Sequence, residues 1–166
     1  MATFALNEQL VTALAAKLTA QLPAAITEIN AAVTDGFTIT NPVEVLDYVP
    51  DEREISAKAS TAPLVGIQDV TSTFKDDIGS SVTGQHAFAV LVWLYDPSRQ
   101  ALARKLRRYQ RALATVCLAG RAISTIGYGV TLRNAAPGPT LEREEDPRGW
   151  VSFTGVVIQS WVDEQT

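Results

Sequence analysis

Apolar residues recur every three or four positions from Leu6 to Val33. This is the period of an amphipathic α-helix that buries one face. Pro23 lies inside the stretch, and its missing N–H and its clash with the preceding turn predict a kink or a break near Gln21–Leu22. The Asp35-Gly36 pair predicts where the helix has ended.

Shorter apolar runs follow between residues 38 and 83. The runs 43–49 and 63–67 are bounded by proline, glycine and acidic residues, which predicts two short strands. Residues 50–54 between them are polar and predict a turn or loop. Residues 76–84, with glycines and hydroxyl residues, predict a second loop that can carry contacts.

The stretch from His86 to Tyr95 is apolar at successive positions, so both faces of a strand there would be buried. This pattern predicts a central strand. Asp96 or Ser98 then caps a second helix, which extends to Leu118 and has an apolar side built from residues spaced by three and four.

Three further segments complete the chain: a short strand at 128–132, a loop rich in proline and acid at 135–148, and a long closing strand at 150–162. The order is helix, strands, helix, strands. We therefore expect an α+β fold with an antiparallel or mixed β-sheet and two main helices packed on one face.

The chain has 166 residues, of which 46% are hydrophobic and 19% charged, a composition typical of a globular protein. This length favours one domain spanning residues 1–166. The formal net charge of −4 argues against a surface that binds nucleic acid throughout, but it allows a local basic patch. No basic leader and no run of about 18 apolar residues stands out, so we expect a soluble, intracellularly made protein without a membrane partner.

Residues for catalysis are scarce. His86 is the only histidine and begins an apolar strand, while the only cysteine, Cys117, lies in an apolar helical run. A catalytic serine would need that one histidine as its base, and no nucleophile motif is present. Residues 127–129 resemble part of a dinucleotide-binding loop but lack its third glycine, which favours a simple bend. We expect no enzyme activity, no metal and no cofactor.

Acidic residues cluster in two predicted loops. A solvated loop is the plainer interpretation of such clusters, and a contact with a basic partner or with a divalent cation is the alternative. The candidate interface residues are Asp76, Asp77, Glu142, Glu144 and Glu145.

The second helix carries a dense basic segment. Its members are Arg104, Lys105, Arg107, Arg108 and Arg111. One interpretation is a solvated face whose arginine stems cover apolar surface. The other is an electrostatic surface for DNA phosphates or for an acidic neighbour, such as the 142–146 loop of the same or another copy.

Several segments together resemble the tail terminator (tail completion) proteins of long-tailed bacteriophages. The similar features are an N-terminal helix with Leu-Pro near its end, the Pro-Val-Glu-Val-Leu segment, and Val-Leu-Val-Trp-Leu-Tyr-Asp followed at once by an arginine-bearing helix. The closing segment from Arg-Gly-Trp-Val-Ser-Phe to Trp161-Val162 also resembles that family. The likeness covers nearly the whole chain.

This resemblance implies a structural virion protein that forms a homo-oligomeric, usually hexameric, ring. Such a ring caps the tail tube and joins it to the head-neck connector, so the implied partners are other copies, the tail tube protein and a neck or connector protein. Non-specific contact with DNA passing through the lumen is also implied. The protein would be made in the host cytoplasm and reside in the tail or neck of the virion.

Two alternatives remain open from sequence. Another neck component, such as a head-closure or adaptor protein, would share the size and style of this chain. A small nucleic-acid or ligand binding module would use the central strand and the basic helix.

Overall fold

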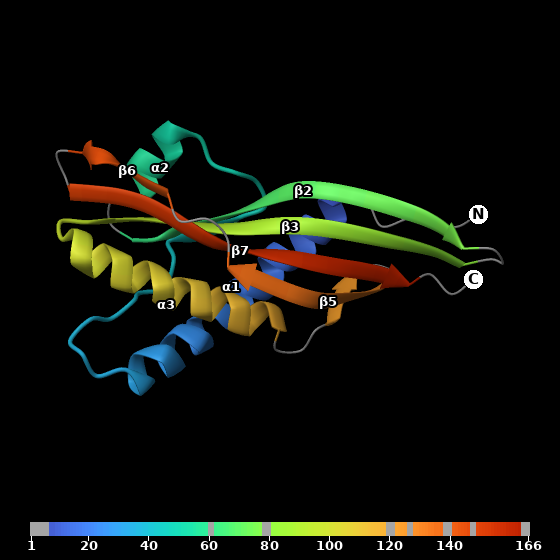
Figure 1. The fold of residues 1–166 in the computed structure, drawn as a ribbon, viewed down its shortest axis with the longest axis horizontal. Coiled ribbons are helices and arrows are strands. Elements are labelled where there is room, and N and C mark those ends of the chain that lie inside the picture. The colour runs from blue at the N-terminus through green and yellow to red at the C-terminus, as the bar shows by residue number, and fades with distance from the viewer. Residues whose placement is uncertain are drawn as a thin grey trace.

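The computed structural model describes residues 7–59, 62–77, 81–118, 122–125, 128–137, 141–146 and 149–163. Within these residues, three helices and seven strands follow one another, and Figure 1 shows their arrangement. The helices are α1 (Asn7–Ala32), α2 (Glu52–Lys58) and α3 (Arg99–Leu118). The strands are β1 (Glu44–Leu46), β2 (Leu64–Asp77), β3 (Ser81–Asp96), β4 (Ala122–Thr125), β5 (Tyr128–Pro137), β6 (Leu141–Asp146) and β7 (Gly149–Asp163).

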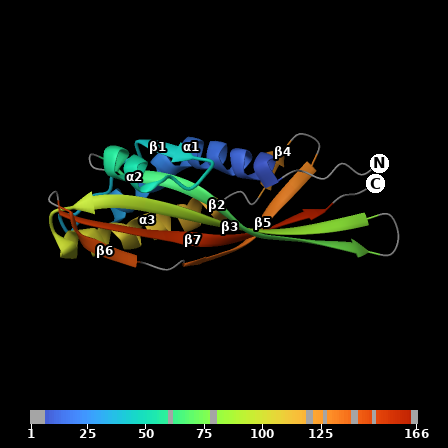
Figure 2. The same ribbon diagram turned by 90° about the horizontal axis from the view of Figure 1, so that it is seen from above.

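The strands form one mixed sheet in the order β1-β2-β3-β7-β5-β4, with β6 also paired to β7. The β1–β2 pair is parallel, and the other strand pairs of the described sheet are antiparallel. The hairpin of β2 and β3 continues past the ends of α2 and α3 as a long arm (Figure 2). The expected α+β fold with helices packed on a mixed sheet is confirmed.

Strand β3 divides the interior into two cores. Phe88, Val90 and Val92 belong to the larger cluster, which also contains the apolar sides of α1 and α3. Ala89, Leu91 and Trp93 alternate with them and join a smaller cluster with Leu46 and Ala59, beside α2. Because successive strand residues point to opposite faces, α1 and α3 cover one face and α2 covers the other. Figure 1 shows α2 and α3 on opposite sides of the strands.

Of the two outcomes expected at Pro23, a kink or a split, the split is wrong, because α1 is one continuous helix through this residue. By length and composition its stretch Glu8–Ala32, with a mean hydropathy of 1.3, could span a membrane, which differs from the sequence-based expectation. Half of that stretch is buried inside the fold. The apolar stripe packs in the larger core, with Leu14, Leu18 and Leu22 fully buried, and this is the behaviour of a core helix.

Helix α3 begins as its sequence predicts. The hydroxyl of Ser98 accepts a hydrogen bond from the Ala101 N–H at 3.3 Å, which satisfies one unpaired donor of the first turn. The Ser98 N–H in turn donates to Oδ1 of Asp96 at 2.8 Å, so the last residue of β3 fixes the turn. The expected apolar side is buried, from Leu102 to Val116.

The polar segment 50–54 is a helix start rather than a loop. Asp51 caps α2 by accepting a hydrogen bond from the Glu54 N–H at 2.8 Å, and the acidic first turn complements the helix dipole. The predicted strand 43–49 is correspondingly reduced to the three residues of β1.

Both predicted acidic loops are largely strand. Asp76 and Asp77 are the last residues of β2 and pair with Val82 and Ser81, so residues 76–77 and 81–84 of the expected loop are strand, and residues 78–80 lie outside the described residues. The expected loop 135–148 contains the end of β5 and all of β6. Glu142 and Glu145 occupy register positions opposite Ser152 and Trp150 of β7, and Glu144 lies between them on β6. These segments have the composition of loops, but backbone hydrogen bonds to a neighbouring strand hold them as strands.

Gly155 provides a test of the packing between the central strands. A Cβ at this position would lie 2.2 Å from the Val90 carbonyl oxygen and 2.8 Å from Leu91 Cδ2. We expect Gly155→Ala to lower the free energy of unfolding by about 1–3 kcal/mol, because backbone must move to admit the methyl group. Urea denaturation measures the change. Gln68→Ala, at an exposed position of β2, is the control, and an equal effect in both variants would contradict the packing argument.

Candidate functional site

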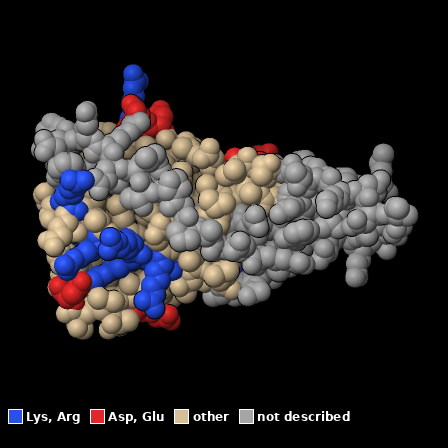
Figure 3. Space-filling model, in the orientation of Figure 1, with Lys and Arg blue, Asp and Glu red and all other residues tan. Residues whose placement is uncertain are grey.

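Basic side chains gather over α3 on one face of the molecule (Figure 3). Arg104, Arg107 and Arg111 are exposed there and follow one another at helical spacing. We call these three residues the basic face. They lie on the side of α3 opposite its buried leucines, so the helix is amphipathic in the sense expected from its sequence.

Arg108 belongs to the same basic segment but is buried. Only 8% of Arg108 is exposed, and its guanidinium donates hydrogen bonds to the Phe37 carbonyl oxygen and to Oδ1 of Asp35. Arg104 approaches the same loop, with Nη1 3.5 Å from Asp35 Oδ2 and Cζ 4.7 Å from the centre of the Phe37 ring. The two arginines therefore hold the chain after α1 against α3.

The loop after α1 is held at several further points. Gly36 has a φ of +82°, a left-handed conformation that favours glycine and turns the chain back. The Asn30 side chain exchanges two hydrogen bonds with the backbone of Ile39, at 2.7 and 3.0 Å. The Tyr109 hydroxyl donates to the Thr40 carbonyl at 2.6 Å and accepts from its N–H at 2.9 Å.

The pKa values of two groups reflect this arrangement. The hydrogen bond from Arg108 lowers the pKa of the Asp35 carboxyl below its ordinary value, and the Phe37 N–H acts in the same direction. Burial raises the pKa of the Tyr109 hydroxyl to about 12. Both shifts favour the protonation states that make the observed hydrogen bonds at neutral pH.

Lys105 also has a structural role. Its Nζ lies 2.6 Å from Oδ2 of Asp96, a carboxylate that is only 5% exposed. A buried carboxylate is costly unless it is paired, so this contact stabilises the start of α3. The predicted basic site thus divides into Lys105 and Arg108, which are committed to the fold, and the exposed basic face. No acidic residue among those that the structure describes forms an ion pair with Arg107 or Arg111.

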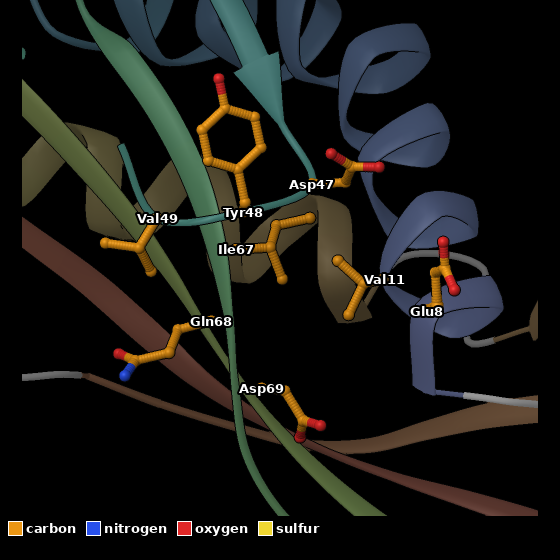
Figure 4. A pocket seen from close by; sticks show the side chains of 8 residues that line it. All are labelled: Glu8, Val11, Asp47, Tyr48, Val49, Ile67, Gln68 and Asp69. Carbon is orange, nitrogen blue, oxygen red and sulfur yellow. The ribbon is translucent and has the colours of Figure 1, made fainter. Parts of the chain in front are cut away.

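A hollow of about 380 Å³ lies on another part of the surface, between the start of α1, the chain after β1, and β2 (Figure 4). We call it the acidic groove. Its lining consists of Glu8, Val11, Asp47, Tyr48, Val49, Ile67, Gln68 and Asp69. Three of these side chains are carboxylates and none is basic. Tyr48 and Val49 expose 46% and 43% of their surface, so the groove also presents apolar contact area.

The groove follows an open edge of the sheet. Strand β1 pairs only with Leu64–Gly66, and no described strand continues along the outer side of β2 beyond that point. The register of β2 with β3 shifts between Asp69 and Thr71, which leaves Val70 as an extra residue, 54% exposed. A bulge of this kind bends an edge strand and interrupts its regular row of hydrogen-bonding groups.

Gly66 allows the groove to form. A Cβ on Gly66 would lie 2.7 Å from the Tyr48 carbonyl oxygen and 2.9 Å from Cδ of Pro50. The chain that carries Tyr48 and Val49 can therefore cross β2 in close contact only because this residue lacks a side chain.

The predicted acidic site residues lie elsewhere. Asp76 and Asp77 are in the β2–β3 arm, and Glu142, Glu144 and Glu145 are on β6; the positions of their side chains lie outside what the structure describes. The described partner of Arg104 and Arg108 is Asp35. The groove acids were missed because Glu8, Asp47 and Asp69 are isolated in sequence and only the fold brings them together.

The other residues considered for chemistry are buried. His86 is 1% exposed and stacks near Phe88, with ring centres 6.1 Å apart, and burial lowers its pKa. Burial raises the pKa of the Cys117 thiol to about 12. Within the described part of the chain, no group of three or more histidine, cysteine or acidic residues is arranged to hold a metal ion. Residue 127 of the expected bend lies outside the described residues, while Tyr128 and Gly129 begin β5.

Arg108 and Arg111 form a matched pair for testing the division of the basic segment. We expect Arg108→Ala to lower the free energy of unfolding by about 1.5–3 kcal/mol, because the Phe37 carbonyl loses its charged donor. Arg111→Ala should change it by less than about 0.5 kcal/mol, as for an exposed residue. Chemical denaturation at neutral pH measures both, and equal effects would show that Arg108 has no special role.

The pKa of Asp35 gives an independent readout of the same contact. Because the pKa is depressed in the folded state, this contribution to stability is present above the unfolded pKa, about 3.9, and is lost as pH falls through the folded value. In Arg108→Ala the Asp35 pKa should move upward in an NMR titration. An unchanged titration would indicate that Arg108 does not cause the shift.

Cys117 reports on whether a reactive nucleophile is present in the native state. With its thiol buried and its pKa raised to about 12, it should react with an aromatic disulfide reagent at pH 8 only when the protein unfolds. We expect negligible labelling in buffer and complete labelling in denaturant. Rapid labelling of the folded protein would contradict the described burial.

No family model matches the chain, and no curated protein matches it. Among solved structures, one chain with 13% sequence identity aligns with 91% of this chain and 96% of its own length, at a TM-score of 0.42. That chain carries a sequence label and no functional name.

Proposed function

We propose that this protein is a structural virion component that forms a ring, caps a phage tail tube and joins the tail to the head-neck connector. The observation that carries the proposal is the presence of two surfaces of opposite charge, the basic face and the acidic groove, on separate elements of one subunit. The resemblance of the sequence to tail terminator proteins points in the same direction.

The two surfaces suit a ring because of symmetry. A closed ring of identical subunits uses a head-to-tail contact, which needs two different and complementary patches on each subunit. In Figure 1 the open part of β2 forms the upper edge of the sheet, whereas α3 lies below β7. Patches on opposite sides of a subunit allow each copy to contact two neighbours.

The β2–β3 arm supports a role at a junction between other proteins. It extends beyond the helices, where no described helix covers it (Figure 2). Paired strands of this length offer a rigid surface for a partner such as the tail tube protein or a neck protein. In this proposal the ring stops tube polymerisation on one side and presents its other side to the connector. It acts without catalysis and resides in the virion tail or neck.

Two other functions remain as candidates. A head-closure or adaptor protein would use the same surfaces on the portal side of the neck. A nucleic-acid binding module is favoured by the basic face, because Arg107 and Arg111 form no ion pair with an acid among the described residues. In a ring, the same arginines could contact DNA in the lumen without reading its sequence.

Native mass spectrometry and negative-stain microscopy of the purified protein test the ring directly. We expect a closed ring, with six copies as the favoured number, and inhibition of tube elongation when the ring is added to the cognate tube protein. A protein that remains monomeric and binds DNA with steep salt dependence would instead support the nucleic-acid binding module. A ring that binds portal-side proteins and leaves tube elongation unchanged would support the head-closure or adaptor role.

A further inference from the structure

We propose that the acidic groove of one subunit receives the basic face of α3 from a second copy of this chain. This inference rests on the proposed function and deepens it, because it names the two surfaces that join neighbours in the ring. In this inference the partner of the basic face is the acidic groove. The sequence had suggested the acidic segment 142–146 as that partner.

Charge is the first reason. The groove is lined by Glu8, Asp47 and Asp69 and has no basic residue in its lining. The oxygen Oδ2 of Asp47 accepts a hydrogen bond from the Thr12 hydroxyl at 3.3 Å, a neutral contact that leaves its negative charge in place. A cationic occupant would gain favourable charge contacts with Glu8 and Asp47, and complementary charge both speeds association and disfavours wrong partners.

The apolar part of the groove is the second reason. Val11 and Ile67 lie at its base and are buried, so its apolar contact area comes from the exposed Tyr48 and Val49 (Figure 4). An arginine side chain has an apolar stem and a charged end, so it can pack against these residues and still reach the carboxylates. Arg107 and Arg111 lie one helical turn apart, with their Cβ atoms about 5–6 Å from each other, so they can enter together.

One member of the basic face, Arg104, is already held in place in the single subunit. Arg104 is held by Asp35 and by the ring of Phe37, while the neighbouring Arg108 fixes the loop below it. Side chains and loops that are ordered before association lose less conformational entropy on binding. These contacts fix α3, which carries Arg107 and Arg111, against residues 35–37 before any association.

The form of the β2 edge favours this occupant over an added strand. Val70 is bulged out of register where the edge passes the groove, and a regular ladder of hydrogen bonds would be interrupted there. Side chains docking into the groove need no such ladder. DNA is disfavoured as the occupant, because the phosphates would meet carboxylates.

Charge reversal on each side tests the pairing. One variant carries Arg107→Glu and Arg111→Glu, and the other carries Glu8→Lys and Asp47→Lys. Each alone should raise the dissociation constant for assembly about tenfold or more, since like charges would face each other across the contact. Combining all four substitutions in one chain, or mixing the two variants in equal amounts, should restore rings, because each face then meets a groove of opposite charge.

Matched controls separate this effect from a change in overall charge. Arg53→Glu on α2 and Glu28→Lys on α1 alter exposed residues outside both surfaces and should leave assembly unchanged. Circular dichroism checks folding, and if a reversal variant is unfolded, Arg107→Gln with Arg111→Gln and Glu8→Gln with Asp47→Asn replace it. These neutral variants should also weaken assembly.

The outcomes distinguish this inference from the proposed function. If the unmodified protein forms rings and both folded variants form them equally well, the proposed pairing is wrong, but the proposed ring is supported. The pairing is also overturned if both variants fail to assemble and neither the mixture nor the combined chain recovers, or if the arginine variant loses only DNA binding. A failure of the unmodified protein to assemble would overturn the proposed ring, and with it this inference.

Discussion

The burial of β3 on both faces is the constraint on which the rest of the structure depends. Its residues alternate between the core under α1 and α3 and the smaller core beside α2. It pairs along most of its length with β2 on one side and β7 on the other. A strand buried in this way must be covered on both faces. Helices α1 and α3 therefore lie on one face of the sheet and α2 lies on the other. The two charged surfaces are positioned by that arrangement.

The parts of the fold that could be predicted are those with a strong hydrophobic period. Helix α1, the start and apolar side of α3, and strands β3 and β7 all follow from the spacing or the density of apolar residues. The parts that were missed depend on partners far away in sequence. Strand β6 is acidic and is held by pairing with β7, and α2 is a short polar helix started by the cap at Asp51. Local composition at these places resembles a loop.

The candidate site was predictable only in part for a related reason. The concentration of arginines on the second helix is visible in the sequence, and the structure retains an exposed basic face there. The sequence could not show that Arg108 is buried while Arg111 is exposed. Arg108 is buried because it bonds to Asp35 and Phe37, which lie more than seventy residues earlier in the chain. The groove carries no sequence signal at all. Its lining comes from α1, the segment after β1, and β2, and only the crossing at Gly66 brings these elements together.

The placement of α1 at the centre of the larger core has a consequence for synthesis on the ribosome. Its leucines are covered by β3 and α3, which lie some 60–100 residues later in the chain. At roughly 5–20 residues per second, the apolar stripe of α1 emerges several seconds before its partners are translated. During that interval a helix with membrane-like hydropathy is without its core. The apolar stripe of α1 therefore stays exposed until β3 and α3 have been made, and slowing translation between α1 and β3 would lengthen that exposure.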